Sequence, residues 1–469
     1  MARFSALSLS LLLAIACGDD STPTTDTGPG DSGSDAALAD TGTTDTGTTD
    51  VGTVDSGGPD VPFVPDANTP DVARIPGSDI EVQTFNLALA GAFVPNEAAR
   101  RTPVIDAVAA LDSDIVCLQE VWEQSDKDLV IAAATANFPH IVSHTTDFST
   151  PITSPEDQTG AIPTPFDTAP CAGYEEELAA AVDCLSENCS TSPGSEEGQT
   201  VSSACAAANC VAAVVPLLTG DADQQRCYSC LTTQLPTETF SEMRDLCTTE
   251  TNATLAFRGQ SSTMILSKFP LSEPVNYVVP GSWNQRVVTV ATATLPSGAE
   301  VDVYCNHLTP IFEDFTFPYT GQYGAGMSGA EGWAAEQLLQ VEKIISLVSE
   351  RSASRPGIIL GDLNTGTAGL GPDLGDEAPA TFERLRDVYE LGVARDFEAQ
   401  CTYCSSNANN DEDTLDVWID HIFLHGLSRS QVTASERTFD EANVDAGDGV
   451  MVPPSDHYGI ASTITIPEP

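Results

Sequence analysis

Short hydrophobic runs rich in β-branched residues recur along the chain, and polar motifs follow them. The runs are residues 80–85, 115–118, 301–305, 357–360 and 417–419. This composition over a few residues predicts buried β-strands. Because a packed sheet brings strand ends together, the polar groups that follow are expected to gather at one end of it.

Other segments have apolar residues spaced three and four apart, which predicts amphipathic helices. The clearest are residues 100–111, 126–137 and 333–349. A helix of this kind packs one face on a sheet and exposes the other. Strands mixed with such helices predict an α/β fold. Residues 80–469 without the segment 151–254 number roughly 285, which is long enough for one large single-core catalytic domain.

The first 17 residues have the pattern of an export signal. Arg3 precedes an apolar run at 4–15, which suits a signal-peptide core and is too short to span a bilayer. The run ends in Ala14-Ile15-Ala16-Cys17, which resembles a bacterial lipobox with Cys17 as the lipidated residue. A plain secretory signal with an incidental cysteine is the alternative. We expect an exported, membrane-anchored lipoprotein of the cell envelope, in the periplasm or on the cell surface.

Residues 18–79 cannot bury a core, because they are mostly Asp, Thr, Gly, Ser and Pro. Asp recurs every fifth residue from Asp35 to Asp60, a spacing that would also suit a calcium repeat. We favour an extended, self-repelling disordered tether that holds the catalytic domain away from a membrane.

A segment at 151–254 interrupts the catalytic pattern and contains eight cysteines. They are Cys171, Cys184, Cys189, Cys205, Cys210, Cys227, Cys230 and Cys247. In an exported protein this density predicts four disulfides, whose pairing the sequence leaves open. Apolar spacing at 174–185, 205–218 and 240–246 predicts short helices, and therefore a stapled helical insertion. Cys227 and Cys230 could form a redox or zinc motif, but a structural disulfide is favoured.

Four further cysteines lie in the catalytic part. Cys401 and Cys404 are in a polar loop and could pair with each other. Cys117 and Cys305 lie inside predicted core strands, so we expect them to be buried packing thiols.

The chain is strongly acidic, with a formal net charge of -51. The charge is -12 in residues 18–79 and -14 in residues 151–254, which leaves about -26 for the catalytic part. Nucleic-acid-binding proteins normally present basic patches to phosphates. The charge therefore disfavours tight DNA or RNA binding and penalises a zwitterionic phosphocholine lipid least. A nuclease is not excluded, because a bound cation offsets charge locally.

Six polar motifs carry the candidate chemistry. They are Thr84-Phe85-Asn86, Leu118-Gln119-Glu120-Val121, Cys305-Asn306-His307-Leu308, Gly361-Asp362-Leu363-Asn364, Ile419-Asp420-His421 and Ser455-Asp456-His457. Each alone is more typical of a turn or a helix cap. Together they supply the carboxylates, amides and imidazoles that hold a hard divalent cation and cleave a phosphoester. The set predicts a metal-dependent phosphohydrolase.

In this order the motifs resemble the endonuclease/exonuclease/phosphatase superfamily, which includes deoxyribonuclease I, abasic-site endonucleases and neutral sphingomyelinases. The resemblance covers residues 80–149 and 255–463, and the stretches 118–140 and 264–279 are most similar to sphingomyelinases. It implies a four-layer α/β sandwich of two mixed β-sheets flanked by helices, with the disulfide-rich helical insertion inside it. The active site would lie at one end of the sheets.

The resemblance also implies a metal site and its neighbours. Glu120 would be the main metal carboxylate, with Asn86 and Asp456 completing the set, and Mg²⁺ would be the ion, with Mn²⁺ or Ca²⁺ as alternatives. Asp362 would orient or deprotonate the attacking water. Asn364 would hydrogen-bond the phosphoryl oxygens, since two side chains that are two residues apart on a strand end point the same way.

Two imidazoles would complete the site. Asp420 would fix the tautomer of His457 and raise its basicity. His307 would donate a proton to the leaving group or stabilise the transition-state charge. Deoxyribonucleases place an acidic partner for this histidine before a strand, where this chain reads Gly259-Gln260-Ser261-Ser262. The partner of His307 is therefore open, and the difference counts against a deoxyribonuclease.

Three functions follow, in order of preference. The first is a monomeric, metal-dependent phosphodiesterase that attacks phospholipid or sphingolipid headgroups with water and associates with a membrane through lipidated Cys17. The second is an exported deoxyribonuclease I-like endonuclease acting on nucleic acid. The third is a non-catalytic surface binding protein on an enzyme fold, which the nearly complete set of polar residues disfavours.

Overall fold

The structure is a computed structural model, and it describes most of the chain from residue 77 onward. The described residues are 77–91, 94–143, 152–153, 168–189, 203–234, 238–250, 253, 255–281, 283–311, 329–411 and 413–469. The export signal, Cys17 and nearly all of the tether lie outside these ranges and remain predictions. Within them, no helix is both long enough and apolar enough to cross a bilayer.

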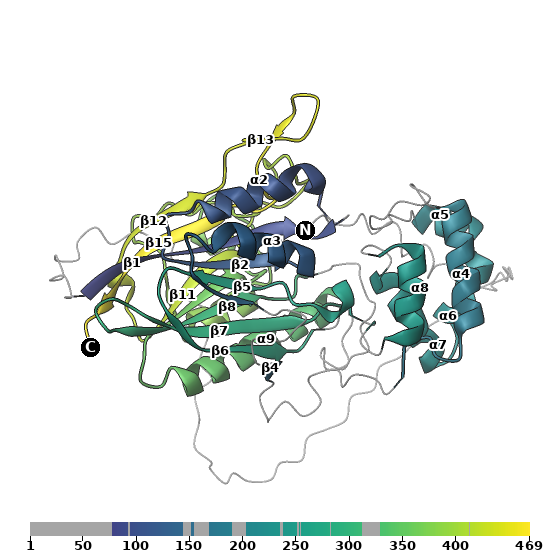
Figure 1. Ribbon diagram of the computed structural model, residues 1–469, viewed down its shortest axis with the longest axis horizontal. Coiled ribbons are helices and arrows are strands. Elements are labelled where there is room, and N and C mark those ends of the chain that lie inside the picture. The colour runs from purple at the N-terminus through teal and green to yellow at the C-terminus, as the bar shows by residue number, and fades with distance from the viewer. Residues whose placement is uncertain are drawn as a thin grey trace, which may run out of the picture.

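Two mixed β-sheets form the centre of the molecule (Figure 1). The first sheet has the order β12-β15-β1-β2-β5-β3. Its strands are β1 (Gly77–Leu89), β2 (Ile115–Val121), β3 (His140–Ser143), β5 (Met264–Ser267), β12 (Val432–Thr438) and β15 (Gly459–Pro467). Strands β1 and β2 are parallel, whereas β15 is antiparallel to β1.

The second sheet has the order β10-β11-β9-β8-β7-β6-β4. Its strands are β4 (Ile152–Thr153), β6 (Leu271–Val279), β7 (Arg286–Thr294), β8 (Glu300–His307), β9 (Gly357–Asp362), β10 (Glu390–Leu391) and β11 (Asp420–His425). Strands β8 and β9 are parallel, and β11 is antiparallel to β9. A separate hairpin pairs β13 (Val444–Asp445) with β14 (Met451–Val452).

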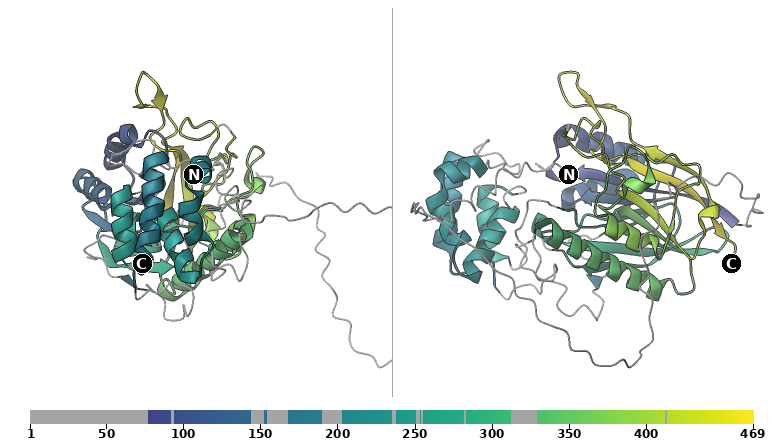
Figure 2. Two further views of the ribbon diagram at one scale, coloured as in Figure 1. Left: turned by 90° about the vertical axis from the view of Figure 1, so that its right-hand side faces the viewer. Right: turned by 180° about the vertical axis from the view of Figure 1, so that it is seen from behind.

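Helices cover the outer faces of both sheets. Helices α2 (Glu97–Ala109) and α3 (Gln124–Ala134) lie over the first sheet, and α9 (Gly329–Arg351) and α10 (Pro379–Arg386) lie over the second (Figures 1 and 2). Apolar residues of α2 and α3 share a core with β1 and β2, while α9 shares one with the second sheet. Burial of these apolar faces is the main stabilising term. The predicted four-layer α/β sandwich is confirmed.

One predicted strand is wrong. Residues 417–419 form only an isolated bridge with Tyr403, and the strand β11 begins at Asp420. Asp456 and His457 likewise precede β15 rather than follow a strand. The physical reason is that β11 and β15 are antiparallel to their neighbours, so they start at the end of the sheet where those neighbours finish.

The prediction of free thiols at Cys117 and Cys305 is also wrong, because the two form a disulfide. Their Cα atoms are 5.3 Å apart, and the bond joins β2 of the first sheet to β8 of the second. Both residues are fully buried between the sheets. Alternation along a strand predicts that such residues point inward, but it does not reveal which residue faces them across the core.

The insertion forms a helical body beyond one end of the sandwich (Figures 1 and 2). Its helices are α4 (Glu175–Asn188), α5 (Ser203–Asn209), α6 (Val211–Leu218), α7 (Ala222–Gln234) and α8 (Phe240–Thr249). Helix α7 was not expected, because its sequence is mostly polar. The four predicted disulfides are confirmed as Cys171–Cys227, Cys184–Cys210, Cys189–Cys205 and Cys230–Cys247. The predicted Cys401–Cys404 bond is confirmed too.

Candidate active site

Strand register brings three of the predicted residues together on the second sheet. His307 on β8 pairs with Asp362 on β9, and Asp362 pairs with Asp420 on β11. Gly361, at a φ of 152°, lets β9 approach β8 closely, since a Cβ there would lie 2.1 Å from the carbonyl oxygen of Asn306. The three side chains therefore share one end of the sheet.

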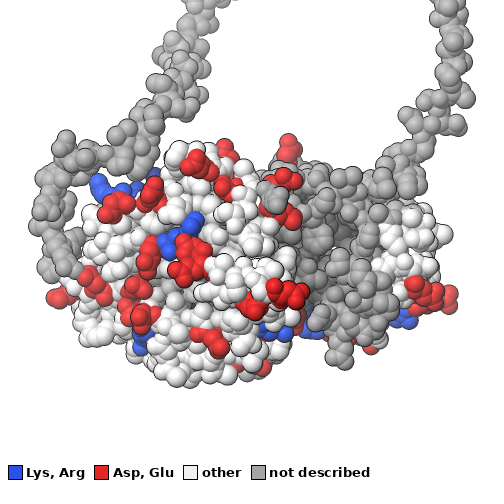
Figure 3. All heavy atoms as spheres, turned by 90° about the horizontal axis from the view of Figure 1, so that it is seen from above, with Lys and Arg blue, Asp and Glu red and all other residues white. Residues whose placement is uncertain are grey.

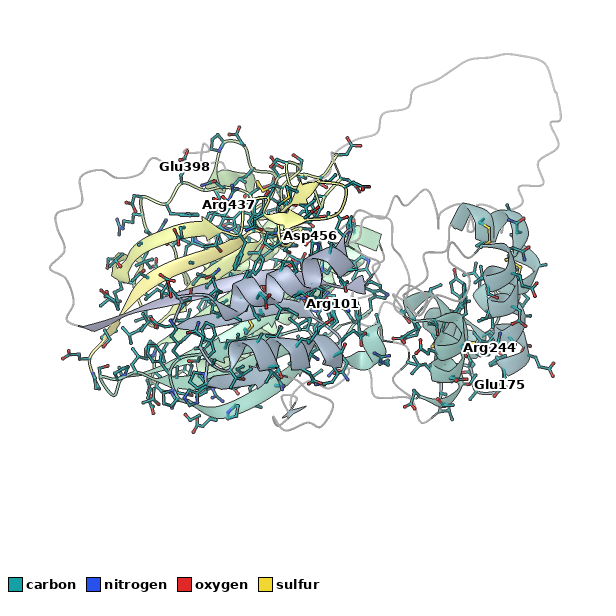
Figure 4. All side chains as sticks on the ribbon, turned by 45° about the horizontal axis from the view of Figure 1, so that its top comes forward. Arg101, Glu175, Arg244, Glu398, Arg437 and Asp456 are labelled. Carbon is teal, nitrogen blue, oxygen red and sulfur yellow. A yellow bond between two sulfur atoms is a disulfide. The ribbon has the colours of Figure 1, made fainter. Side chains whose placement is uncertain are left out.

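The first sheet supplies the opposite wall of the site. Asn86 lies near the end of β1, Glu120 near the end of β2, and Asp456 and His457 just before β15. Figure 4 labels Asp456 at the end of the sandwich nearest the insertion. All eight predicted catalytic and metal residues are buried, none more than 4% exposed.

Asp362 lies at the centre of the cluster. Its Oδ2 accepts a hydrogen bond from Asn86 Nδ2 at 3.0 Å, and its Oδ1 accepts one from the backbone N–H of Asn364 at 2.9 Å. The Nε2 atoms of His307 and His457 lie 3.6 Å and 3.8 Å from Oδ2. Burial raises the pKa of Asp362 to about 7, although His457 opposes that shift. One carboxylate is thus flanked by both imidazoles.

His457 is held by a carboxylate. Its Nδ1 lies 2.9 Å from Asp420 Oδ2, and its ring packs at a tilt against Tyr403, 5.0 Å between centroids. Burial alone would lower the pKa of His457, but the surrounding carboxylates, Asp420 first, raise it to about 10. The imidazole is therefore a cation at neutral pH in this arrangement. The contact predicted between Asp420 and His457 is present.

His307 has an uncharged partner, which answers the question that the sequence left open. Its Nδ1 lies 3.1 Å from the hydroxyl of Ser262, while its Nε2 lies 3.8 Å from Glu120 Oε1. Burial, followed by the nearby Arg286 guanidinium, lowers the pKa of His307 well below its usual value. His307 is therefore neutral, and the two imidazoles of the site carry different charges.

The donor set fits a hard divalent cation. Ligand atoms of Glu120, His307 and Asp362 lie within 4.8 Å of one another, and so do those of Asp362, Asp420 and His457. Glu120 adopts a left-handed backbone with φ of 55°, a strained conformation typical of functional sites. Burial, and then the charge of Asp456, raises the pKa of Glu120. Buried carboxylates that repel each other in this way are suited to share a cation.

Two predicted amides make contacts that the sequence did not suggest. Asn86 Oδ1 accepts from the backbone N–H of Ala88 at 2.9 Å, and its Nδ2 is directed at Asp362. Asn364 lies outside β9, has φ of 46°, and donates through Nδ2 to the carbonyl of Leu308. The expectation that Asp362 and Asn364 point the same way along one strand is therefore wrong, because the strand ends at Asp362.

A loop at residues 401–411, the asparagine loop, orients the backbone beside His457. Asn407 and Asn409 donate through Nδ2 to the carbonyl of Ser455, and Asn410 donates to that of Asp456. Asparagine side chains commonly satisfy backbone groups in irregular segments. Three asparagines close together in a polar loop are the sequence signal for such a role.

Ser262, Trp122 and Arg286 also belong to the site but were not predicted. The Trp122 ring lies 5.7 Å from that of His307, and the Arg286 guanidinium lies 5.6 Å from the Trp122 ring. The sequence does contain a signal for Arg286. It is a basic residue at the start of a buried strand, in a chain that has only 18 Lys and Arg residues. No sequence feature distinguishes Ser262 as a site residue, because serines are common in loops.

The site also contacts the segment that returns from the insertion to β5, residues 255–263, here called the return segment. Phe257 stacks on Trp122 with 4.6 Å between centroids and 4° between ring planes. Arg258 pairs with Glu238 of the insertion at 3.0 Å and with Glu123 of the catalytic part. The insertion is therefore connected to the same end of the sandwich as the candidate site.

Several solved structures are similar to the chain. Sphingomyelinase C from Streptomyces griseocarneus has 12% identity and a TM-score of 0.46, over 83% of this chain and 100% of that one. A Staphylococcus aureus beta toxin with bound magnesium ions has 12% identity and a TM-score of 0.44 over the same shares. Truncated Caenorhabditis elegans TDP2 has 12% identity and a TM-score of 0.41, over 82% of this chain and 97% of that one.

No curated protein sequence matches the chain. The family model described as Endonuclease/Exonuclease/phosphatase family matches residues 84–457. This range runs from the first polar motif to His457 and includes every residue of the buried cluster. The chain belongs to the endonuclease/exonuclease/phosphatase family.

Proposed function

We propose that the protein is a divalent-metal-dependent phosphodiesterase that cleaves its substrate by direct attack of water. The observation that carries the proposal is the position of Asp362 Oδ2, 3.6 Å and 3.8 Å from the Nε2 atoms of two differently charged imidazoles. Membership of the family supports a phosphoester hydrolase. A carboxylate with a pKa near 7 is matched to proton transfer at neutral pH.

The carboxylate that would hold the cation is Glu120, with Asp456 adding charge nearby. Bound there, Mg²⁺, Mn²⁺ or Ca²⁺ would polarise a phosphoryl oxygen and offset its negative charge. Asn86 fits a supporting role, since its amide holds Asp362 in place. Of these ions, Mg²⁺ suits a site with few carboxylates best.

Side chains of the protein would carry out the remaining steps of the reaction. Asp362 would orient the attacking water and take its proton, as its position and its raised pKa allow. His457, held as a cation by Asp420, would stabilise the charge that develops on the phosphoryl oxygens. His307 is neutral, and its Nε2 accepts or donates no hydrogen bond among the described residues, so it would hydrogen-bond the leaving-group oxygen. As the P–O bond breaks, that oxygen would take up the proton that Asp362 has removed from the water.

For the substrate we propose a phospholipid or sphingolipid headgroup, of the kind a sphingomyelinase or phospholipase C cleaves. The surface supports this choice. Figure 3 shows acidic side chains scattered over the visible face with few basic ones among them. A polyanion would be repelled by such a surface, whereas a zwitterionic headgroup has no net charge. Export and anchoring through Cys17 would bring the enzyme to a membrane.

The test is hydrolysis of sphingomyelin vesicles and plasmid DNA by the full-length protein, each with Mg²⁺ and with EDTA. His457→Ala is the inactive variant, and His140→Ala, which changes a half-buried histidine of β3 outside the site, is its matched control. We expect lipid cleavage that needs Mg²⁺, disappears in His457→Ala and persists in His140→Ala.

Other outcomes would identify other functions. Cleavage of DNA alone would make the protein a deoxyribonuclease I-like endonuclease despite its charge. Binding of either substrate without turnover in any divalent metal would make it a surface binding protein. Full activity in EDTA would refute the metal-dependent mechanism.

A further inference from the structure

Two arginines are fully buried near the site, and their surroundings differ. Arg100 on α2 donates to backbone carbonyls through all of its guanidinium nitrogens, with Pro95, Ala88 and Pro454 each at 3.0 Å. Arg286 donates only through Nη1, to the carbonyl of His307 at 3.3 Å. Its Nε and Nη2 are buried and have no acceptor among the described residues.

The unpaired nitrogens of Arg286 are next to each other on the guanidinium. Nε–H and Nη2–H point in parallel from one edge of the group, and this edge is the one that binds two oxygens of a carboxylate or phosphate at once. Arg286 is 2% exposed, so bulk water does not satisfy it. A buried cation without partners is strongly unfavourable, and proteins retain one mainly where a ligand completes it.

Arg286 lies beside the reaction centre. It holds the carbonyl of His307, and the carboxylates that act most strongly on its charge are Glu120 and then Asp362. Neither carboxylate forms an ion pair with it, since no ion pair of Arg286 lies within 4.0 Å in the described part of the chain. The cation is therefore close to the carboxylate cluster but separate from it.

The local chain makes room for this side chain. Arg286 is the first residue of β7 and pairs with Val279 at the end of β6. A Cβ on Gly281, in the turn between them, would lie 2.5 Å from the carbonyl oxygen of Asn284 and 3.0 Å from Arg286 Cγ. The central carbon of the guanidinium lies 5.6 Å from the centroid of the Trp122 ring, so the indole packs beside the cation.

We propose that Arg286 is a catalytic residue whose Nε and Nη2 bind the two non-bridging oxygens of the phosphoryl group undergoing cleavage. This inference rests on the proposed function and adds the protein's own positive charge to it. The charge of a phosphodiester would then be shared between the cation site and Arg286. Phosphoryl transfer depends on such stabilisation of charge on the equatorial oxygens.

The test compares Arg286→Met and Arg286→Lys with Arg395→Gln, a matched control that removes an exposed arginine of the same domain. Steady-state hydrolysis is measured with Mg²⁺ on the substrate that the wild type cleaves. We expect Arg286→Met to lower kcat/KM by about 100-fold or more, and Arg286→Lys to restore only part of it. Arg395→Gln should match the wild type.

Binding of inorganic phosphate to the Mg²⁺-loaded protein gives a readout that does not need turnover. We expect calorimetry to show phosphate affinity at least about tenfold weaker in Arg286→Met than in the wild type. The melting temperature of Arg286→Met should not fall below that of the wild type, because the variant loses an unpaired buried charge rather than a satisfied one.

Three results would overturn the proposal: unchanged kcat/KM, unchanged phosphate affinity, or a lower melting temperature that accounts for the lost activity. A wild-type protein that cleaves no phosphodiester would instead refute the proposed function. In that case phosphate binding would still test Arg286 directly.

Discussion

Two histidines of similar burial differ in charge because their partners differ. His457 has the Asp420 carboxylate at 2.9 Å, and its pKa is raised to about 10. His307 has the Ser262 hydroxyl at 3.1 Å, and its pKa lies well below the usual value. A carboxylate stabilises an imidazolium, whereas a hydroxyl only orients the ring. The difference supports the proposed roles, in which His457 stabilises developing charge and His307 acts as a neutral hydrogen-bonding group.

Asp420→Asn should lower kcat by at least about 100-fold, because the amide cannot hold His457 as a cation or fix its tautomer. The measurement is steady-state hydrolysis with Mg²⁺. Asp411→Asn, which changes an exposed carboxylate of the asparagine loop, is the control. Equal activity in Asp420→Asn and the wild type would show that the carboxylate is not needed.

Ser262→Ala should have a smaller effect, a loss of about 2- to 10-fold in kcat. The variant removes one neutral hydrogen bond, which stabilises by about 0.5–1.5 kcal/mol. Kinetics of the single and double variants with Asp420→Asn would check this. Because both imidazoles flank Asp362, the two effects on the activation free energy should be coupled rather than simply additive. A loss as large as that of Asp420→Asn would mean that Ser262 does more than orient His307.

At the scale of elements, the site depends on irregular segments as much as on strands. The asparagine loop fixes the backbone before His457, and the return segment carries Ser262 to His307. The return segment also adopts left-handed backbone at Phe257, Arg258 and Gly259 in succession. Such a conformation persists only where contacts determine it, here the Trp122 stack and the two ion pairs of Arg258.

The contact between insertion and catalytic part should depend on pH through Glu238. This residue is 3% exposed, and burial raises its pKa from 4.5 to about 7, partly opposed by Arg258. Between those values the unfolded chain loses a proton that the folded protein retains. The stability contributed by Glu238 is therefore full below pH 4.5 and is lost as pH rises through 7.

The check is the melting temperature of Glu238→Gln and of the wild type between about pH 5 and pH 8, a range that spans the titration. The wild type should lose stability relative to the variant across this range, since glutamine does not titrate. Glu250→Gln, at an exposed position after α8, should run parallel to the wild type. Parallel curves for Glu238→Gln would show that Glu238 does not titrate as its burial requires.

The strands with clear apolar runs and the helices with clear apolar spacing were predicted from the sequence. The eight polar residues that lie together at the candidate site were predicted too. Periodicity reports local burial, and polar residues that follow several buried strands are expected to meet at one end of a sheet. The disulfide between Cys117 and Cys305, the role of Ser262 and that of Arg286 depend on which residues meet across the sandwich. Those contacts are set by sheet topology, which local patterns do not encode.

At the scale of the whole molecule, the site is assembled from residues of two different sheets. Glu120 and His307 come from different sheets, and the Cys117–Cys305 bond lies three and two residues before them. Gln119 Nε2 lies 2.8 Å from Cys117 Sγ, so the bond is also enclosed by polar contacts. The disulfide therefore fixes the distance between the two walls of the site.

Replacing both cysteines by alanine should lower the free energy of unfolding by about 2–4 kcal/mol, the range typical of a disulfide that closes a long loop. It should also weaken activity, because the sheets can move relative to each other. Denaturant unfolding and kinetics would check both effects. A Cys401→Ala/Cys404→Ala variant, whose bond spans three residues, should lose less stability. Equal losses would contradict the inter-sheet role.

The same bond also determines when the protein can mature. Its two cysteines are 188 residues apart, with the whole insertion between them. A chain emerging from the ribosome cannot close this bond until β8 has been made, and a reducing cytosol would keep it open afterwards. The protein would thus reach its final form late and only in oxidising surroundings, so any activity that depends on this bond would begin there.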